Sequence, residues 1–133
     1  MALLHLEILT PDREALSAEV SEVNLPGTLG RLGILPNHTA LISSLTFGPL
    51  TYKQSGVEKK CLCGSGFVEV RDNRVSVLVK SAESDDEIDV DRAKKALERA
   101  RSRLNSKGPD INVVRAELAL QRAQSRLRFL NQL

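Results

Sequence analysis

Arginine residues recur at matched positions in the last third of the 133-residue chain. When the sequence is shifted by 23 residues, positions 88–104 align with positions 111–127, and 11 of these 17 residues are identical. Arginine meets arginine at three places: Arg92 with Arg115, Arg99 with Arg122, and Arg103 with Arg126. A guanidinium group presents its N–H donors in a planar fork that suits carboxylates and phosphates. The repeated arginines therefore indicate an anion site, and a polyphosphate would suit several of them at once.

The acidic segment "ESDDEID" at 83–89 lies just ahead of the first of these arginines. Glu83 and Asp89 could accept hydrogen bonds from an amine such as that of adenine, so an adenine nucleotide is one interpretation of the pattern. The alternative is that the arginines are solvated flanks of surface helices or pair with Glu98 and Glu117. The residue types alone leave both interpretations open.

Charge is divided unevenly along the chain. Positions 1–90 hold 8 Lys and Arg residues against 13 Asp and Glu residues, a net charge of −5, whereas positions 91–133 hold 11 against 4, a net charge of +7. A basic hairpin that binds nucleic acid is therefore a competing function. The 3% content of aromatic residues and the acidic remainder of the chain argue against it, because stacking on bases needs aromatic rings.

Other residue types offer little for catalysis. His5 and His38 are the only histidines, and the sequence contains neither a G-x-x-x-x-G-K-[ST] phosphate loop nor a G-x-S-x-G elbow. Cys61 and Cys63 share one strand face, but with no second Cys pair and no nearby His they cannot complete a four-ligand zinc site. We expect no catalytic residue, no metal site and ordinary reduced cysteines.

Short strands are predicted up to about position 80. The alternation in "LHLEIL" puts Leu4, Leu6 and Ile8 on one face, and "RVSVLVK" does the same at 74–80. Turn residues separate these runs, and Asp72-Asn73 is typical of a two-residue hairpin loop. The pattern predicts an antiparallel β-sandwich or barrel.

A helical period of three and four residues begins after this region. The predicted seam residues fall into two sets, Val90, Ala93, Leu97, Ala100 and Leu104, then Val113, Ala116, Leu120, Ala123, Leu127 and Leu130. Gly108-Pro109 separates the two helices, with Asp89 as N-cap of the first and Asp110 or Asn112 as N-cap of the second. We expect an α+β fold in two domains: an antiparallel β-sandwich over 1–84 and an antiparallel two-helix hairpin over 85–133.

The order of four segments resembles the epsilon subunit of bacterial F-type ATP synthases along essentially the whole chain. These segments are "ILTPDRE", "GRLGILPNH", "GSGFVEVRDNRVSVLV" and the two-helix tail. The resemblance implies a ten-stranded flattened sandwich that binds the gamma subunit and the c-ring and turns with them. It implies no catalytic residue and no required cofactor. The tail is implied either to fold against the sandwich or to extend toward the alpha and beta subunits, where it hinders ATP hydrolysis.

ATP is the regulatory ligand that the resemblance implies, because some members of the family bind it through an I/L-D-x-x-R-A motif. "IDVDRA" at 88–93 matches that motif in full. Carried over to this chain, the adenine side consists of Glu83, Ile88, Asp89 and Ala93. The phosphate side consists of Arg92, Arg99, Arg122 and Arg126. A free-standing ATP sensor is the alternative to a subunit of the synthase.

Membrane contact is expected only through the complex. No apolar run approaches the roughly 20 residues that span a bilayer, and "MALLHLEILT" lacks the basic start of a signal peptide. The resemblance places the chain peripherally at the cytoplasmic face of the cell membrane, with no nucleic-acid partner.

The segment "GRLGILPNH" at 30–38 resembles an active-site loop at first sight, but it lacks an acid, a cysteine or a second histidine beside His38. We expect Gly30 and Gly33 to supply special backbone conformations, and Leu32, Ile34 and Leu35 to enter the core. His38 is expected to be a hydrogen-bonded turn residue. The resemblance implies rotor contacts in such loops, with Arg31 and His38 as the candidates.

Overall fold

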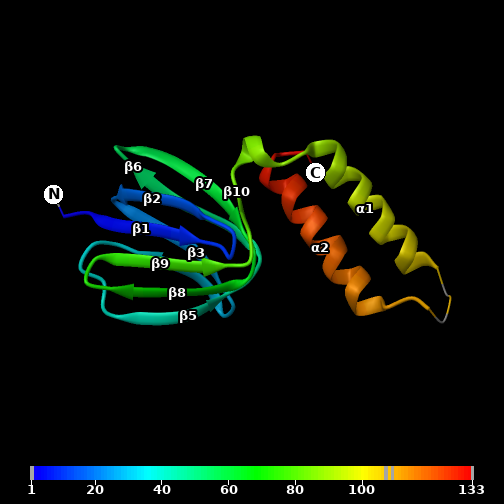
Figure 1. Cartoon of the computed structure of the whole chain (residues 1–133), viewed down its shortest axis with the longest axis horizontal. Helices are drawn as coiled ribbons and strands as arrows, with labels where there is room; N and C mark the ends of the chain where they lie inside the picture. The colour runs from blue at the N-terminus through cyan, green and yellow to red at the C-terminus, as the bar shows by residue number, and fades with distance from the viewer. Residues whose placement is uncertain (1, 107, 109, 133) are drawn as a thin grey trace. The chain divides into compact units, whose positions relative to one another are not determined.

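The computed structural model describes residues 2–106, 108 and 110–132, and its elements are labelled in Figure 1. Over these residues the chain forms two compact units, Met1–Ser84 and Asp85–Leu133. The first unit contains the strands β1 (Leu4–Leu9), β2 (Glu14–Val20), β3 (Glu22–Gly27), β4 (Gly30–Ile34), β5 (Leu41–Leu45), β6 (Gly48–Gln54), β7 (Val57–Cys63), β8 (Gly66–Arg71), β9 (Arg74–Val79) and β10 (Ala82–Glu83). The second contains a 3-10 helix η1 (Asp85–Glu87) and the helices α1 (Val90–Asn105) and α2 (Val113–Phe129).

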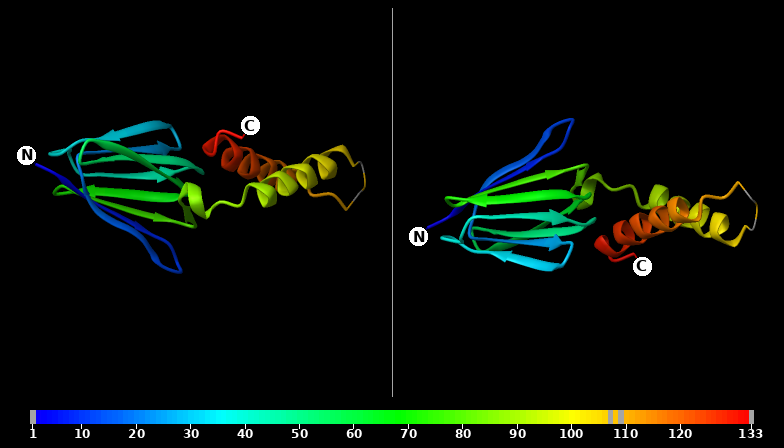
Figure 2. Two further views of the ribbon diagram at one scale, coloured as in Figure 1. Left: turned by 90° about the horizontal axis from the view of Figure 1, so that it is seen from above. Right: turned by 90° about the horizontal axis from the view of Figure 1, so that it is seen from below.

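The strands join in one continuous sheet of order β10-β7-β6-β3-β5-β8-β9-β1-β2, with β4 paired to β3. This sheet folds into two layers (Figure 2), and β2 at one end of the path contacts β6 near the other. The expected β-sandwich and α+β class are therefore confirmed. One pair departs from the antiparallel rule, because β1 runs parallel to β9.

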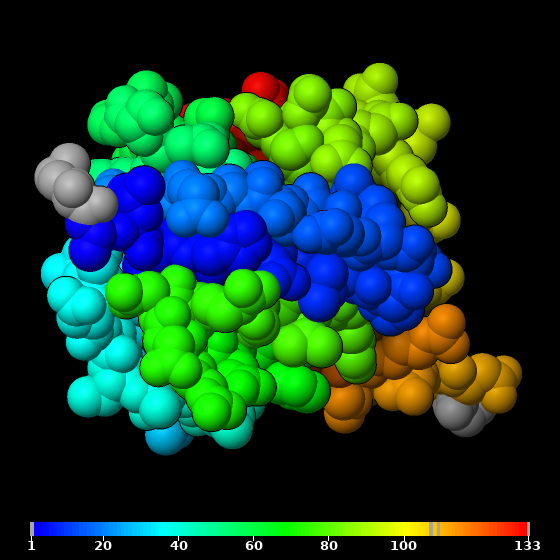
Figure 3. Space-filling model, turned by 60° about the vertical axis from the view of Figure 1, so that its left-hand side comes forward, coloured from blue at the N-terminus to red at the C-terminus, as the bar shows by residue number. Residues whose placement is uncertain are grey.

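The core of the sandwich is made by the alternating residues of its strands. Leu4, Leu6 and Ile8 are fully buried, and Leu6 and Ile8 lie beside Val75 and Val77 in the parallel register. In the space-filling view, β1 and β2 (blue) cross the face next to β9 (green) (Figure 3). The period-two prediction for these strands is confirmed.

The turn between β8 and β9 is the two-residue loop that the sequence predicts. Asp72 and Asn73 have φ values of 50° and 60°, as a type I′ hairpin requires. The side-chain oxygen of Asn73 also accepts a hydrogen bond of 2.6 Å from the backbone N–H of Asn37. This turn therefore ties the β8–β9 hairpin to the loop after β4.

Two expectations for the segment at 30–38 are wrong, one for Gly33 and one for Leu35. Gly30 has a φ of 135°, which favours glycine, whereas Gly33 has no positive φ, and a methyl group there would meet only the Asn24 side chain, at 3.3 Å. Ile34 is buried, but Leu35 is 57% exposed, so the prediction that it enters the core is wrong. The reason is that Leu35 directly follows the buried Ile34, and neighbouring residues of an extended chain point to opposite faces.

Both helices begin at side-chain N-caps. Asp89 Oδ1 accepts from the backbone N–H of Arg92 at 3.1 Å, and Asn112 Oδ1 accepts from that of Arg115 at 3.0 Å. The cap at Asp89 is confirmed, and Asn112 rather than Asp110 caps the second helix. Pro109, part of the predicted break, lies outside the described residues.

The two helices pack through a small seam. Its buried core is Ala93 and Leu97 from α1 with Ala123 and Leu127 from α2, and Val90, Ala96 and Leu120 pack against it. Val113 is 52% exposed, so its place in the predicted seam is wrong. It is the first residue of α2, and the buried face of that helix starts only at Ala116. Neither helix, over the residues described, is long and apolar enough to cross a membrane.

A titratable thiol in the core should make the sandwich labile at alkaline pH. The hydrogen bond to Cys61 and burial both raise the pKa of Cys63. A raised pKa stabilises the fold below the pKa of the unfolded thiol, near 9.0, and this contribution is lost as the pH rises further. Urea denaturation should show the free energy of unfolding falling by about 1.4 kcal/mol per pH unit above that value. A Cys63→Ala variant should show a shallower slope, and parallel slopes would contradict the assignment.

Candidate ligand site on the helical hairpin

The start of α1 combines groups that attract an anion with a carboxylate that opposes one. Arg92 lies in the first turn, where the unpaired N–H groups of the helix carry a partial positive charge. Asp89 lies beside it as the cap, with one carboxylate oxygen bound to the Arg92 N–H. The cap uses only the backbone N–H of Arg92, and the residue is exposed. Its guanidinium group therefore stays available to a ligand.

An open groove runs along this face of α1 and brings three of the predicted residues together. Its lining consists of Asp89, Asp91, Arg92, Lys95, Glu98, Arg99 and Ser102. Arg92 and Arg99 lie two turns apart, about 10 Å along the helix axis. Three acidic side chains face three basic ones in this lining, so α1 alone gives the groove no surplus of positive charge.

The other two predicted arginines, Arg122 and Arg126, belong to α2. Arg126 directly precedes Leu127 and Arg92 directly precedes Ala93, and Leu127 and Ala93 belong to the same buried cluster. Arg92 and Arg126 therefore lie at the same level of the hairpin. In an antiparallel pair built from a repeated sequence, a twofold relation keeps equivalent flanks on the same side. Arg122 is exposed and Arg126 half-buried, although the lining of the groove consists of α1 residues.

Of the four residues predicted for the adenine side, the groove contains only one. Ala93 is 4% exposed and packs in the seam, and Ile88 is 7% exposed. Glu83 ends β10 and belongs to the sandwich unit, outside the set that the hairpin brings together by itself. Asp89 is the one predicted adenine partner in the groove.

Sequence reasoning missed Lys95 and Ser102, which line the groove with the arginines. Their spacing from Arg92 is three and ten residues, which falls on one face of a helix. The periodicity that revealed the seam therefore contained the signal for this face as well.

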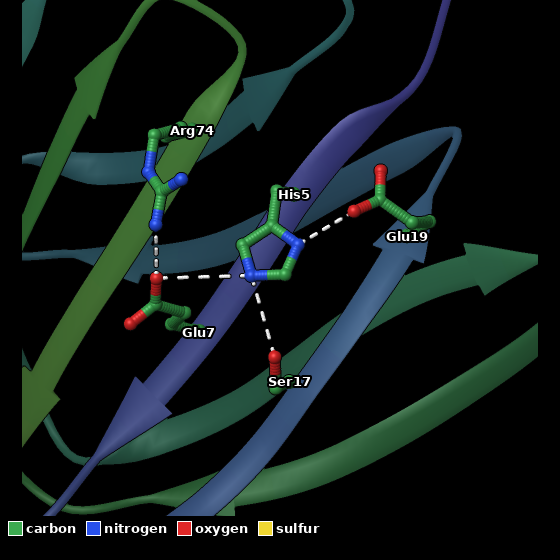
Figure 4. A network of polar contacts seen from close by, with 5 residues as sticks. All are labelled: His5, Glu7, Ser17, Glu19 and Arg74. Atoms are coloured by element: carbon green, nitrogen blue, oxygen red, sulfur yellow. Dashed lines mark hydrogen bonds and ion pairs between the residues drawn. The ribbon is translucent and has the colours of Figure 1, made fainter.

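A polar cluster on the outer face of the sheet was also missed (Figure 4). His5 Nδ1 lies 2.6 Å from Glu19 Oε1, and His5 Nε2 lies 3.3 Å from Ser17 Oγ and 3.7 Å from Glu7 Oε1. Arg74 donates to Glu7 from the neighbouring strand β9. Alternation places His5 and Glu7 on one face of β1, but the partner at Arg74 is 67 residues away and has no local signal.

Exposed apolar side chains mark a second candidate surface on the sandwich. A groove on one face is lined by Leu9, Pro11, Phe67 and Leu78, of which Phe67 is 53% and Leu78 40% exposed. Leu29, at the turn between β3 and β4, is fully exposed. Exposed apolar groups that cluster in this way are typical of protein interaction surfaces.

The two rotor-contact candidates at 30–38 make local bonds. Arg31 donates from Nη1 to the carbonyl oxygen of Pro49 at 2.7 Å. His38 Nδ1 lies 2.7 Å from the carbonyl oxygen of Thr39, as expected for a hydrogen-bonded turn residue. Arg31 is exposed and His38 half-buried, and both bonds join residues of the sandwich unit.

Two family models match the chain, one for each unit. The model for the ATP synthase delta/epsilon chain β-sandwich domain matches residues 3–85. The model for the long α-helix domain of the same chain matches residues 86–131.

Similar proteins of known name are bacterial ATP synthase epsilon chains. The chain is 52% identical to that of Pelotomaculum thermopropionicum over 102 residues, which cover 77% of this chain and 76% of the relative. It is 48% identical to that of Nitratidesulfovibrio vulgaris over 101 residues, covering 76% and 75%.

Two solved structures share the fold. A chain in the Euglena gracilis mitochondrial ATP synthase aligns with a TM-score of 0.74 and 22% identity, covering 99% of this chain and 79% of that one. A chain in the Tetrahymena thermophila mitochondrial ATP synthase central stalk and c-ring aligns with a TM-score of 0.59 and 20% identity, covering 97% and 94%. On the evidence of both family models and of relatives near 50% identity, this chain belongs to the delta/epsilon chain family of ATP synthase.

Proposed function

We propose that the chain is a non-catalytic subunit of the central stalk of an F-type ATP synthase, with a regulatory helical hairpin. The observation that carries this proposal is the match of both units, in order, to the two domains of one ATP synthase chain. One of the similar solved structures is an assembly of OSCP, F1 and c-ring, and the other is a central stalk with its c-ring. By analogy, this chain binds the gamma subunit and the c-ring at the cytoplasmic face of the membrane.

The sandwich is the docking unit in this proposal. The groove of Leu9, Phe67 and Leu78, together with the exposed Leu29, offers apolar area that a partner would cover. Apolar surface removed from water contributes about 25 cal/mol per Å², so a few such side chains supply a useful share of the binding energy.

The hairpin is the regulatory unit. ATP that binds between Arg92, Arg99, Arg122 and Arg126 stabilises the closed hairpin, and at ten times its dissociation constant it adds about 1.4 kcal/mol. When ATP is scarce, the hairpin opens, and its basic helices extend toward the alpha and beta subunits to hinder hydrolysis. A bias of this size switches the population only if the two arrangements are close in energy.

The experiment compares two assembled complexes, one with the full chain and one with a chain that ends at Ser84. Both should assemble with gamma and the c-ring, because the sandwich carries the docking surface. The shortened chain should give several-fold faster ATP hydrolysis at low ATP. Failure of the full chain to join the complex would refute the stalk role, and equal hydrolysis rates would refute the inhibitory role alone.

A further inference from the structure

Arg13, in the loop between β1 and β2, bonds a strand that lies 69 residues later in the chain. Its Nη2 atom donates to the carbonyl oxygen of Ala82 in β10 at 2.9 Å. Arg13 directly precedes β2, which ends the sheet path on one side, and β10 ends the path on the other. We propose that this bond latches β10 to the sandwich and so fixes the point from which the helical hairpin pivots.

The loop that carries Arg13 is held by its own hydrogen bonds. The backbone N–H of Thr10 donates to the carbonyl oxygen of Arg13 at 2.9 Å, and Thr10 Oγ1 donates to the same oxygen at 3.2 Å. The backbone N–H of Arg13 donates in return to Thr10 Oγ1 at 3.2 Å. Pro11 fixes a further backbone angle between them. The backbone of Arg13 is therefore in place before its side chain reaches β10, and the segment "ILTPDRE" gains a role.

The carbonyl group of Ala82 points away from β7, its neighbour in the sheet. Ala82 lies opposite Cys63, and in the next pair the Gly64 N–H donates to the Ser81 carbonyl oxygen at 2.8 Å. Hydrogen bonding alternates along an antiparallel pair, so the N–H and C=O groups of Ala82 face the edge where the sheet path ends. The Arg13 guanidinium group supplies a donor at this edge, and a charged donor makes a stronger bond than a neutral one.

β10 is a short strand at a sensitive place. It consists of Ala82 and Glu83, and it pairs with β7 through two residue pairs. β9 ends at Val79, and the helical hairpin unit begins at Asp85. If β10 detaches, residues 80–83 join the linker and add roughly 14 Å of reach, at about 3.5 Å per extended residue. The latch therefore decides how long a tether the hairpin has.

This inference rests on the regulatory role proposed above for the hairpin, but the latch is measurable on the full chain without the synthase. Arg13→Met keeps an apolar stem and removes the donors. The Gly64 N–H reports on β10, because its acceptor is the Ser81 carbonyl oxygen. Amide hydrogen exchange followed by NMR should show this N–H exchanging at least about tenfold faster in the variant, with β1 and β9 unchanged. Arg13→Lys keeps the charge and a donor, so it should give a smaller acceleration.

Arg74→Met is the matched control. Arg74 is the first residue of β9, at the end far from β10 in sequence, and its side chain bonds Glu7 on the neighbouring strand. Exchange at Gly64 should stay within about twofold of the unmodified chain, because distant sites act independently. An unchanged rate in Arg13→Met would overturn the latch. Equal acceleration in the Arg13→Met and Arg74→Met variants, or faster exchange throughout the sheet, would overturn it as well, since either indicates a general loss of stability.

The pivot is tested in three assembled complexes, with the full chain, the Arg13→Met chain and a chain that ends at Ser84. A longer tether lowers the local concentration of the helices at any one place. The Arg13→Met complex should therefore hydrolyse ATP faster than the full-chain complex at low ATP, and more slowly than the shortened one. If Arg13→Met matched the full chain while the shortened chain was faster, the pivot would be refuted. Equal rates in all three would refute the inhibitory role itself, whereas the latch is decided by exchange alone.

Discussion

Replacement of Arg92 and Arg126 together by alanine should abolish ATP binding to the chain at millimolar concentration. A hydrogen bond to a charged group contributes about 1.5–3 kcal/mol, so two lost bonds weaken binding at least about 100-fold. Isothermal titration calorimetry of the full chain with ATP measures the effect. The helix caps stay intact, because Asp89 binds the backbone of Arg92 and not its side chain.

The matched control removes the same charge from the same helices. Arg101 and Arg115 are both exposed, and neither lines the groove that holds Arg92 and Arg99. An Arg101→Ala, Arg115→Ala variant should bind ATP within about threefold of the unmodified chain, since it loses only long-range attraction that salt screens. Equal losses in the two double variants would show that net charge, and not a site, attracts the nucleotide.

Gly66→Ala should destabilise the sandwich more than the same substitution at any other glycine of the chain. Gly66 pairs with Leu45 on one side and Val79 on the other. An added Cβ would lie 2.8 Å from Val79 Cα and closer still to the Leu78 carbonyl oxygen. Both obstacles are backbone atoms held in the sheet, so β8 must shift, at a cost of about 3 kcal/mol or more.

Gly33→Ala is the control for this variant in the same unit. Its Cβ would meet only the Asn24 side-chain oxygen, at 3.3 Å, and that group can rotate away. Urea denaturation followed by circular dichroism should place Gly33→Ala within about 0.5 kcal/mol of the original. A Gly66→Ala chain of unchanged stability would mean that the β8–β9 pair is less rigid than its register indicates.

Local patterns predicted the elements that bury one face. Leu4, Leu6 and Ile8 alternate, and Ala93 and Leu97 recur at helical spacing, because each element must hide its apolar side chains. Leu35 was misplaced because it alternates with the buried Ile34, and Val113 because it is the first residue of α2, ahead of the buried face of that helix.

Contacts between residues far apart in the sequence could not be predicted from local patterns. The parallel register of β1 with β9 and the Glu7–Arg74 bond join segments with no shared local signal. The candidate ligand site divides in the same way. The groove residues of α1 follow from helical spacing within one element, whereas the level of Arg126 against Arg92 also depends on the antiparallel packing of two helices, in which Ala93 and Leu127 share one buried cluster.

The seam of the hairpin contains two alanines among its four buried residues, and this composition sets how often the helices separate. A methyl group buries far less apolar area than a leucine side chain, so the hairpin gains little from staying closed. Backbone amides of α1 and α2 should therefore exchange their hydrogens with solvent orders of magnitude faster than those of β1 and β9. The chain thus joins a slowly exchanging sandwich to a helical pair that opens as a separate cooperative unit, without melting its neighbour.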